Sequence, residues 1–459
     1  MLKASRAERL FLDRFRCQED LADFHVTGNM SEEEGYFRLG SDATCYGRLS
    51  SRVPARNVTD SLYDVREDIG ILESSVHFPF DPAEVVENLL CERYAASSGT
   101  KTVSANNIVR SLYYLVRPIL SGAERKYVQR RYFRNWKDIP FPTWPVDRTV
   151  ESIFEQLMIL WMKARRTNRL PFIWFWPDGA GSCTTVTHDV ETSAGWKFCP
   201  QLMDLDDLFG IKSSFQIIPE GRYKVALPAL ESIKSRGFEV NVHDLNHDGR
   251  LFRDRELFLR RVEGINRHAK RFGSLGFRSG SLYRNAEWYH ALDVSYDMSI
   301  PNVAHLDPQR GGCCTVLPFF IGEILELPLT TTQDYSLFHI LRDYSIRLWE
   351  EQISLIREKH GLVSFNVHPD CVIDQSARRV YAELLQRLSQ LREDGQTWIG
   401  LPNEVAAWWR LRNKMNLVSA GGRWRIEGEG RERASLAYAV LVDNSLTYEL
   451  PQVRDCVSK

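Results

Sequence analysis

The hydrophobic positions become regular from about residue 170 onward. Short apolar runs there alternate with stretches in which apolar residues recur every three or four positions. The first pattern predicts buried strands and the second predicts amphipathic helices. The expected strands are 184–189, 213–218, 238–243, 275–278, 295–299, 324–329, 362–368 and 397–401, and the expected helices are 201–208, one ending at 237, 253–272, 339–360, 377–392 and 403–412. This alternation indicates an α/β fold with a parallel sheet or (β/α) barrel.

The chain on either side of this region is patterned differently. Short strands are expected at 35–40, 44–49, 423–426, 436–442 and 446–450, and helices at 82–94 and 105–120. The proline-rich segment 140–145 is expected to be a stiff connector. The hydrophobic pattern changes again after Gly421-Gly422. We therefore predict an N-terminal accessory region at 1–145, a catalytic barrel at 146–415 and a small β-rich tail at 416–459.

Composition narrows the class of protein. Apolar residues make up 43% of the chain and charged residues 26%, as in globular proteins, and the net charge of -1 argues against a nucleic-acid partner. The nine cysteines are scattered and odd in number, which favours reduced thiols. Residues 1–9 lack the apolar stretch of a secretory signal, and no run approaches the roughly 18 to 20 apolar residues of a spanning helix. These features predict a cytoplasmic protein.

One segment leaves room for a contact with membranes. Residues 108–120 are apolar apart from Arg110 and Arg117, and a basic stretch follows from Arg125 to Lys137. We expect a helix packed on the main domain, followed by solvated charges. Peripheral contact with a membrane surface is the alternative.

Polar residues fall at or near the C-terminal ends of five expected strands. They are Asp189, His243, Arg278, Asp297 and His368. The C-terminal edge of a parallel sheet or barrel is where active sites are built. Core packing does not require polar residues at those positions, so we expect a functional site there.

Two short motifs could together hold a metal ion. His243 and His247 are four residues apart, and both rings lie on one face if the strand continues into a helix. Asp189 and Glu191 are two residues apart at a strand end, so their carboxylates point the same way. One carboxylate can complete a His-His-carboxylate site, and the other can accept a proton from water on the metal. By itself, the histidine spacing also fits two ordinary histidines.

The remaining polar residues at this edge fit supporting roles. His368 follows an apolar strand and suits a general acid. Arg278 beside a catalytic carboxylate would hold that carboxylate ionised and oriented. The ordinary alternatives are a structural histidine and a surface ion pair.

Taken together, five ordered motifs resemble the polysaccharide deacetylase family, also called the NodB-homology or carbohydrate esterase 4 family. The resemblance covers about residues 180–412. The motifs are 187–191, 243–247, 277–280, 296–297 and 363–369. The resemblance implies a distorted (β/α) barrel and a divalent metal, commonly zinc, used to remove acetyl groups from N-acetylated sugars.

The resemblance also assigns a role to each residue. It implies that His243 and His247 bind the metal and that Asp189 is the base. It further implies that Arg278 tethers Asp189, that His368 is the general acid, and that Asp297 orients His368.

The first motif departs from the family pattern. The usual adjacent aspartates are replaced by Asp189-Val190-Glu191, which resembles the His-Asp-Val-Asp-type branches of the superfamily. Glu191 is therefore the expected metal carboxylate, with Asp189 as the alternative ligand. Ser279 also replaces a common proline, which affects the expected substrate more than the chemistry.

The expected function is hydrolysis of an acetamide on an N-acetylated sugar or polysaccharide precursor. Without an export signal, a lipid-linked or nucleotide-linked precursor is the expected form. Hydrolysis of another C–N bond, in a cyclic imide or ureide, is one alternative. A catalytically silent carbohydrate-binding protein is the other.

Overall fold

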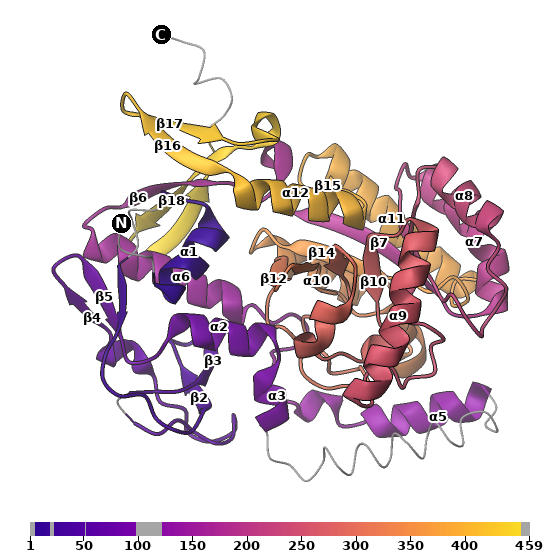
Figure 1. Ribbon diagram of the computed structural model, residues 1–459, viewed down its shortest axis with the longest axis horizontal. Helices are drawn as coiled ribbons and strands as arrows, with labels where there is room; N and C mark the ends of the chain where they lie inside the picture. The colour runs from indigo at the N-terminus through magenta and orange to yellow at the C-terminus, as the bar shows by residue number, and fades with distance from the viewer. Residues whose placement is uncertain (1–4, 19–22, 51, 98–121, 451–459) are drawn as a thin grey trace. The chain divides into compact units, whose positions relative to one another are not determined.

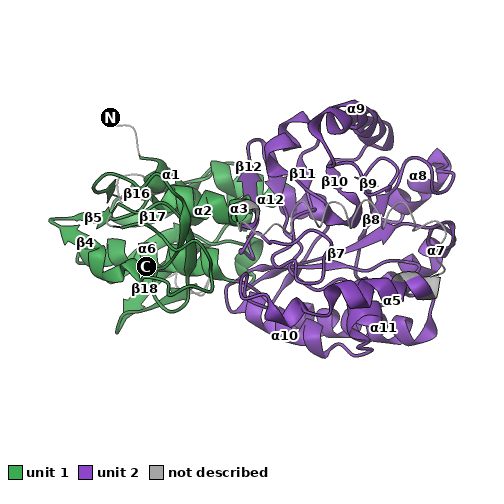
Figure 2. Ribbon diagram, turned by 90° about the horizontal axis from the view of Figure 1, so that it is seen from below, with its two compact units in different colours: residues 1–94, 148–180, 407–459 green, residues 95–147, 181–406 purple. Residues whose placement is uncertain are grey.

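The computed structural model describes residues 5–18, 23–50, 52–97 and 122–450 (Figure 1). The chain forms two compact units, each built from segments that are far apart in the sequence (Figure 2). Unit 1 comprises Met1–Tyr94, Arg148–Ala180 and Ala407–Lys459, and unit 2 comprises Ala95–Asp147 and Gly181–Ala406. The expected helix at 105–120 lies outside the described residues.

These units differ from the three regions predicted from the sequence. The expected tail strand β18 (Leu436–Val442) pairs with β6 (Arg169–Ile173), a segment that the prediction placed in the barrel. The boundary expected at Gly421-Gly422 is instead the two-residue turn of a hairpin between β16 (Asn416–Ala420) and β17 (Arg423–Glu427). Strands need backbone partners, and the apolar pattern does not reveal pairing between segments more than 260 positions apart.

Unit 1 contains small sheets and a few helices. The predicted strands near residues 35–49 form an antiparallel pair, as expected. The bounds are α1 Arg6–Phe15, β1 Phe24–Val26, β2 Gly35–Arg38, β3 Thr44–Gly47, β4 Gly70–Leu72, β5 Ser75–Phe78, α2 Pro82–Leu90, α6 Thr149–Ala164 and β19 Ser445–Glu449; α3 (Arg93–Ser97) and α12 (Pro402–Lys414) cross the division between the units.

Unit 2 is built on a nine-stranded sheet, parallel except for one edge strand. The order is β12-β13-β11-β10-β9-β8-β7-β14, and β15 also pairs with β7. The strand bounds are β7 Cys183–Val190, β8 Ser214–Ile217, β9 Glu239–His243, β10 Gly276–Arg278, β11 Tyr296–Asp297, β12 Phe319–Ile321, β13 Ile324–Glu326, β14 Leu362–Asn366 and β15 Trp398–Ile399. The predicted α/β fold of the barrel type is confirmed. The sheet curls into an incomplete barrel.

The barrel remains open between β13 and β14, where no backbone ladder forms among the described strands. Side chains bridge the gap instead. Thr330 Oγ1 donates to the Leu362 carbonyl at 2.7 Å, and Thr331 Oγ1 donates to the Ser364 carbonyl at 2.8 Å. Two buried threonines thus link the chain after β13 to β14, and the parallel ladder between β14 and β7 brings the end of β14 to the site.

Helices surround the sheet of unit 2 (Figure 2). They are α7 Ser193–Leu208, α8 Leu227–Ser235, α9 Arg255–Phe272, α10 Arg347–Arg357 and α11 Gln375–Glu393, with α5 Gly122–Phe133 at the edge. Local signals set their ends: the Asp254 carboxylate caps α9 by accepting from Leu257 N, and Gly273 ends it in the left-handed conformation. The helix predicted at 339–360 begins only at Arg347, because a π-helical turn, Ser336–Leu341, ends at a left-handed Arg342.

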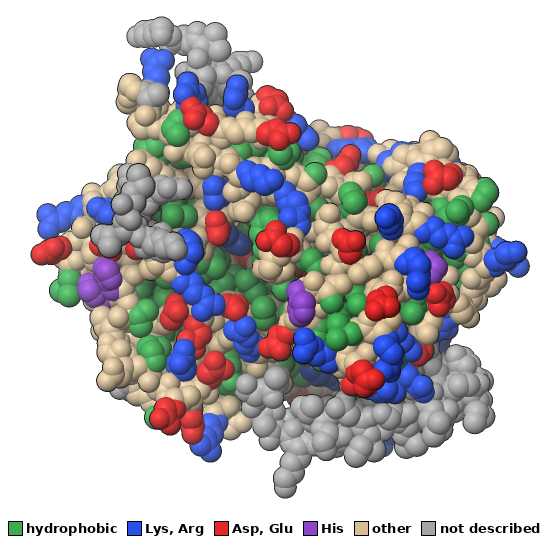
Figure 3. Space-filling view, in the orientation of Figure 1, with side chains coloured by type: hydrophobic (Ala, Val, Ile, Leu, Met, Phe, Trp, Pro, Cys, Tyr) green, Lys and Arg blue, Asp and Glu red, His purple; other side chains and the backbone are tan. Residues whose placement is uncertain are grey.

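The distribution of charge on the surface and the state of the cysteines agree with the expectations from the composition. Acidic and basic side chains are interspersed over the face drawn in Figure 3. All eight cysteines in the described ranges are free thiols. Within those ranges, no helix has the length and apolar character that crossing a bilayer would require.

Candidate metal centre and active site

Four of the five predicted residues meet at the C-terminal edge of the unit 2 sheet. Asp189, His243 and Arg278 end or nearly end strands β7, β9 and β10 of the same sheet, and His368 follows β14. These strands run parallel, so their C-terminal ends lie at the same edge. The predicted position of the site is therefore the observed one for these four residues.

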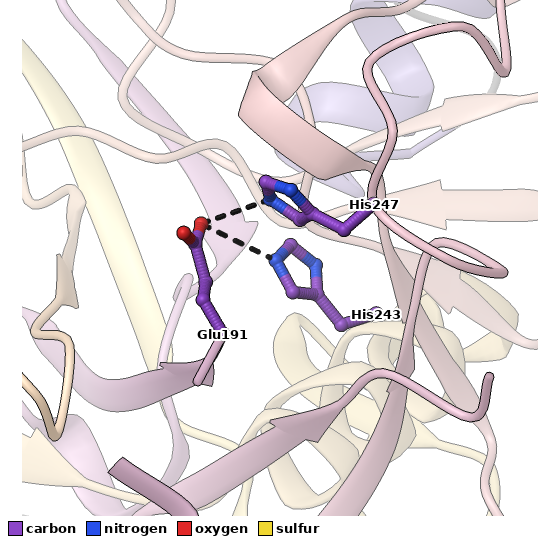
Figure 4. A group of neighbouring side chains, drawn as sticks. All are labelled: Glu191, His243 and His247. Carbon is purple, nitrogen blue, oxygen red and sulfur yellow. Dashed lines mark ion pairs between the residues drawn. The ribbon is translucent and has the colours of Figure 1, made fainter. Parts of the chain in front are cut away.

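Glu191, His243 and His247 form a group that could hold a metal ion (Figure 4). Glu191 Oε1 lies 2.9 Å from His247 Nε2 and 3.9 Å from His243 Nε2. Metal bonds of about 2.0–2.1 Å in a tetrahedral site would place neighbouring ligand atoms about 3.3 Å apart. The observed separations lie on either side of that value, so small adjustments would accommodate an ion.

The hydrogen bonds of the two histidines support this interpretation. His243 Nδ1 lies 3.1 Å from the Arg278 carbonyl, which fixes this nitrogen as the donor and leaves a lone pair on Nε2. His243 Nε2 and His247 Nε2 are both buried, and within the described structure Glu191 is the group that approaches them, without a well-aligned hydrogen bond to either. Buried polar atoms are rarely left without a partner, and a metal ion would satisfy both.

The two histidines do not share a helix, in contrast to the expectation from their spacing. His243 ends β9, and His247 lies in a loop in which Asp244 and His247 have φ values of +55° and +53°. Gly280 packs against this loop. A Cβ at Gly280 would lie 2.5 Å from Asp244 Oδ2 and 3.0 Å from His247 Cδ2. The close approach requires glycine and holds His247 toward Glu191.

Asp189 is held by two donors. Arg278 Nη1 donates to Asp189 Oδ1 at 3.0 Å, and Asn366 Nδ2 donates to Asp189 Oδ2 at 2.8 Å. Burial alone would raise the pKa of Asp189, but the positive charge of Arg278 is the largest of the opposing effects, and the pKa is lowered overall. The carboxylate is therefore ionised and fixed, with Oδ2 3.7 Å from His243 Nε2.

His368 is held by Asp334. His368 Nδ1 lies 2.6 Å from Asp334 Oδ1, and the His368 backbone N donates to Asp334 Oδ2 at 2.8 Å. Burial would lower the pKa of His368, but the charges and hydrogen bonds of Asp334 and Glu191 raise it well above its usual value. His368 Nε2 faces the metal group at 3.6 Å from Glu191 Oε1, and the raised pKa favours the protonated ring.

Asp297 does not lie against His368, so the orienting role expected for it is not supported. Its carboxylate accepts from Ser299 N at 2.9 Å and Ser299 Oγ at 2.7 Å. It pairs across the sheet with Glu326, whose pKa is raised well above the usual range by burial and by the charge of Asp297. The resemblance placed the aspartate on β11, whereas the structure supplies it from the loop after β13.

The charge of the metal group favours ion binding. Burial would raise the pKa of Glu191, but the charge of His247 and hydrogen bonds from the surrounding histidines lower it well below the usual value. Burial would likewise lower the pKa of His247, and Glu191 raises it. Glu191 therefore remains a carboxylate, the form that binds metal.

Sequence reasoning missed Asp334 and Asn366. Asn366 had a usable signal: it lies two positions before His368, so alternation along β14 places it on the same side. The signal for Asp334 was weaker. Asp334 comes eight residues after the end of β13, so its position at a strand end could not be used to select it. The run of threonines that bridges β13 and β14 carries the chain onward to Asp334, and no periodic pattern predicts that path.

Comparisons with known proteins give only distant similarities. No protein-family model and no curated protein matches the chain. A protein from Mycobacterium smegmatis, provisionally named a polysaccharide deacetylase, is 16% identical with a TM-score of 0.43, covering 54% of this chain and 96% of its own. Puue allantoinase is 12% identical with a TM-score of 0.41, covering 51% and 92%. The peptidoglycan deacetylase PdaC from Bacillus subtilis is 11% identical with a TM-score of 0.32, covering 50% and 93%.

Proposed function

We propose that the protein is a metal-dependent hydrolase that removes an acetyl group from an N-acetylated sugar or sugar precursor. The observation that carries the proposal is the convergence of three features on one edge of the sheet. These are the ligand group of Glu191, His243 and His247, the buried carboxylate of Asp189, and the ring of His368 held by Asp334. The set provides a metal site, a base and an acid within a few ångströms of one another.

Glu191 is the proposed metal carboxylate. Its Oε1 faces both imidazole nitrogens, whereas both oxygens of Asp189 already accept hydrogen bonds from Arg278 and Asn366. A divalent ion, with zinc as the expected metal, would supply a Lewis acid that activates water and polarises the acyl carbonyl.

The residues of the chain complete the reaction. Asp189 accepts the proton of the attacking water through the carboxylate that Arg278 keeps ionised. His368 donates its Nε2 proton to the departing amine, and Asp334 keeps the ring oriented and charged for that transfer. General acid and base catalysis each contribute roughly 10²- to 10⁴-fold to such rates.

The experiment measures acetate release by the full-length, zinc-loaded protein from N-acetylated sugars. The proposal expects turnover that His243→Ala abolishes together with stoichiometric metal binding. Ring opening of a cyclic imide or ureide without acetate release would favour the other C–N hydrolase. Absence of metal binding would favour a silent binding protein.

A matched control separates loss of the site from loss of the fold. His290 is an exposed histidine outside the site. His290→Ala should therefore leave both metal binding and turnover unchanged.

A further inference from the structure

Unit 2 contains one strongly basic segment. Residues 95–137 contain nine Lys or Arg residues and a single acidic residue, Glu124, for a formal charge of +8. The whole chain has a net charge of -1, so positive charge is concentrated in this segment. Such concentrations are typical of segments that meet an anionic partner.

Helix α5 carries four of these basic residues and contacts two segments of unit 2, the helical turn Ser336–Leu341 with the adjoining Tyr335 and the loop that contains Arg310. The Tyr335 hydroxyl donates to Gln129 Oε1 at 2.5 Å, and Arg130 Nη1 lies 3.5 Å from the His339 carbonyl. At the C-terminal end of α5, the Arg310 guanidinium lies 5.2 Å from the centre of the Phe133 ring. Contacts at both its middle and its end fix the place of the helix.

This place is beside the proposed general acid. Tyr335 directly follows Asp334, the partner of His368, and the Tyr335 ring centre lies 6.4 Å from the His368 ring centre. The Tyr335 and His339 ring centres are 4.9 Å apart. Because His368 would protonate the departing amine, the sugar lies on this side, and a substituent beyond the sugar can extend toward α5.

The basic side chains on this side of α5 have no acidic ion-pair partner in the part of the chain that the structure describes. Lys126 and Arg130 are half-buried, and neither forms an ion pair with a carboxylate among the described residues. Burial and the positive charges of Lys126, His368 and Arg130 lower the pKa of His339 to about 4, even though Asp334 opposes this effect. Two cations thus lie near His339, and neither has a counter-ion among the described residues.

We propose that Lys126 and Arg130 bind a phosphate group of the substrate, so that the enzyme acts on an N-acetylated sugar linked to a phosphate or diphosphate. Lysine and arginine are the side chains that bind phosphate, as a point charge and as a two-pronged donor respectively. The inference rests on the proposed function for the identity of the sugar. A soluble nucleotide sugar and a lipid-linked sugar share this phosphate chemistry.

The first test measures binding to the metal-free, full-length protein, because a bound ion would itself attract phosphate. Isothermal titration compares UDP-N-acetylglucosamine with N-acetylglucosamine. The wild type should bind the phosphorylated compound at least tenfold more tightly, and Lys126→Ala/Arg130→Ala should reduce this preference to about twofold. The same preference in the double variant as in the wild type would overturn the proposal, as would no preference in the wild type.

The matched control removes one lysine and one arginine from another helix. Arg267 and Lys270 are exposed on α9, and Arg267→Ala/Lys270→Ala should keep the wild-type preference. An equal loss in both double variants would indicate a general charge effect and overturn the assignment to α5.

Two further measurements separate the possible sources of phosphate and the two proposals. Co-sedimentation with phosphatidylglycerol vesicles, lost in the α5 variant and retained in the α9 variant, would support a lipid-linked phosphate. Acetate release tests the proposed function independently: its absence from every substrate, with the binding preference intact, would refute deacetylation and leave the phosphate site standing. Equal release from both sugars, with equal KM, would refute the phosphate site alone.

Discussion

Replacing Asp334 by Asn tests how His368 is held. Asp334 is fully buried and accepts from His368 Nδ1 at 2.6 Å, His368 N at 2.8 Å and Tyr335 N at 2.7 Å. Asparagine keeps the size of the side chain but removes the charge that keeps the ring protonated. Hydrogen bonds to charged groups contribute about 1.5–3 kcal/mol, and each 1.36 kcal/mol changes a rate tenfold, so kcat should fall by roughly 10- to 150-fold.

The assay is steady-state acetate release, with kcat and KM measured separately. KM should change little, because Asp334 acts through His368. His368→Ala should be at least as slow, and adding Asp334→Asn to it should cost little more, because the two residues act as one unit.

Asp297→Asn is the matched control, since Asp297 is the aspartate that the sequence assigned to this role. Its carboxylate contacts Ser299 rather than His368, so kcat should stay within a few-fold of the wild type. A larger loss for Asp297→Asn than for Asp334→Asn would refute the assignment.

Four further changes test other parts of the site and fold. Gly280→Ala should weaken zinc binding at least tenfold in a competition titration, because its Cβ would displace His247 and Asp244; unchanged affinity would contradict the close packing. Arg278→Lys should lower kcat by about tenfold or more, since one ammonium cannot replace the bonds to Asp189 and Thr187; full activity would show that the tether is dispensable. Thr331→Val should lower the free energy of unfolding by about 1–3 kcal/mol in denaturant titrations, because the Ser364 carbonyl loses its buried donor, and a neutral effect would argue against side-chain closure of the barrel. Removing metal with a chelator should lower the Tm, because zinc at 100 times its Kd stabilises the folded state by about 2.7 kcal/mol, and an identical Tm with and without zinc would argue against a native site.

The sequence predicted the elements of unit 2 better than their connections. The helices and strands around His243, Arg278 and His368 lie near their expected positions, because alternating apolar patterns reflect burial directly. The same logic placed polar residues at the C-terminal edge of the parallel sheet. This prediction succeeded because the C-terminal ends of parallel strands meet at one edge of a sheet, whatever the order of the strands.

The errors arise where long-range pairing or loop geometry decides the outcome. The partner of β18 is β6, and their paired residues are 263 (Leu436 and Ile173) to 271 (Val440 and Arg169) positions apart in the chain. Asp334 reaches His368 through a loop without periodicity, so a resemblance that relies on strand ends selected Asp297 instead. The turn at His247, with its left-handed backbone, could not be distinguished from a helix by spacing alone.

Anomalous diffraction at the zinc edge, from crystals of the zinc-loaded protein, would show directly which residues bind the metal. We expect one strong peak bonded at about 2.0–2.2 Å to Glu191 Oε1, His243 Nε2 and His247 Nε2, with Asp189 outside bonding distance. A peak held instead by Asp334, His368 and Cys371, the other group of potential ligands in the described structure, would contradict the account, as would no bound zinc.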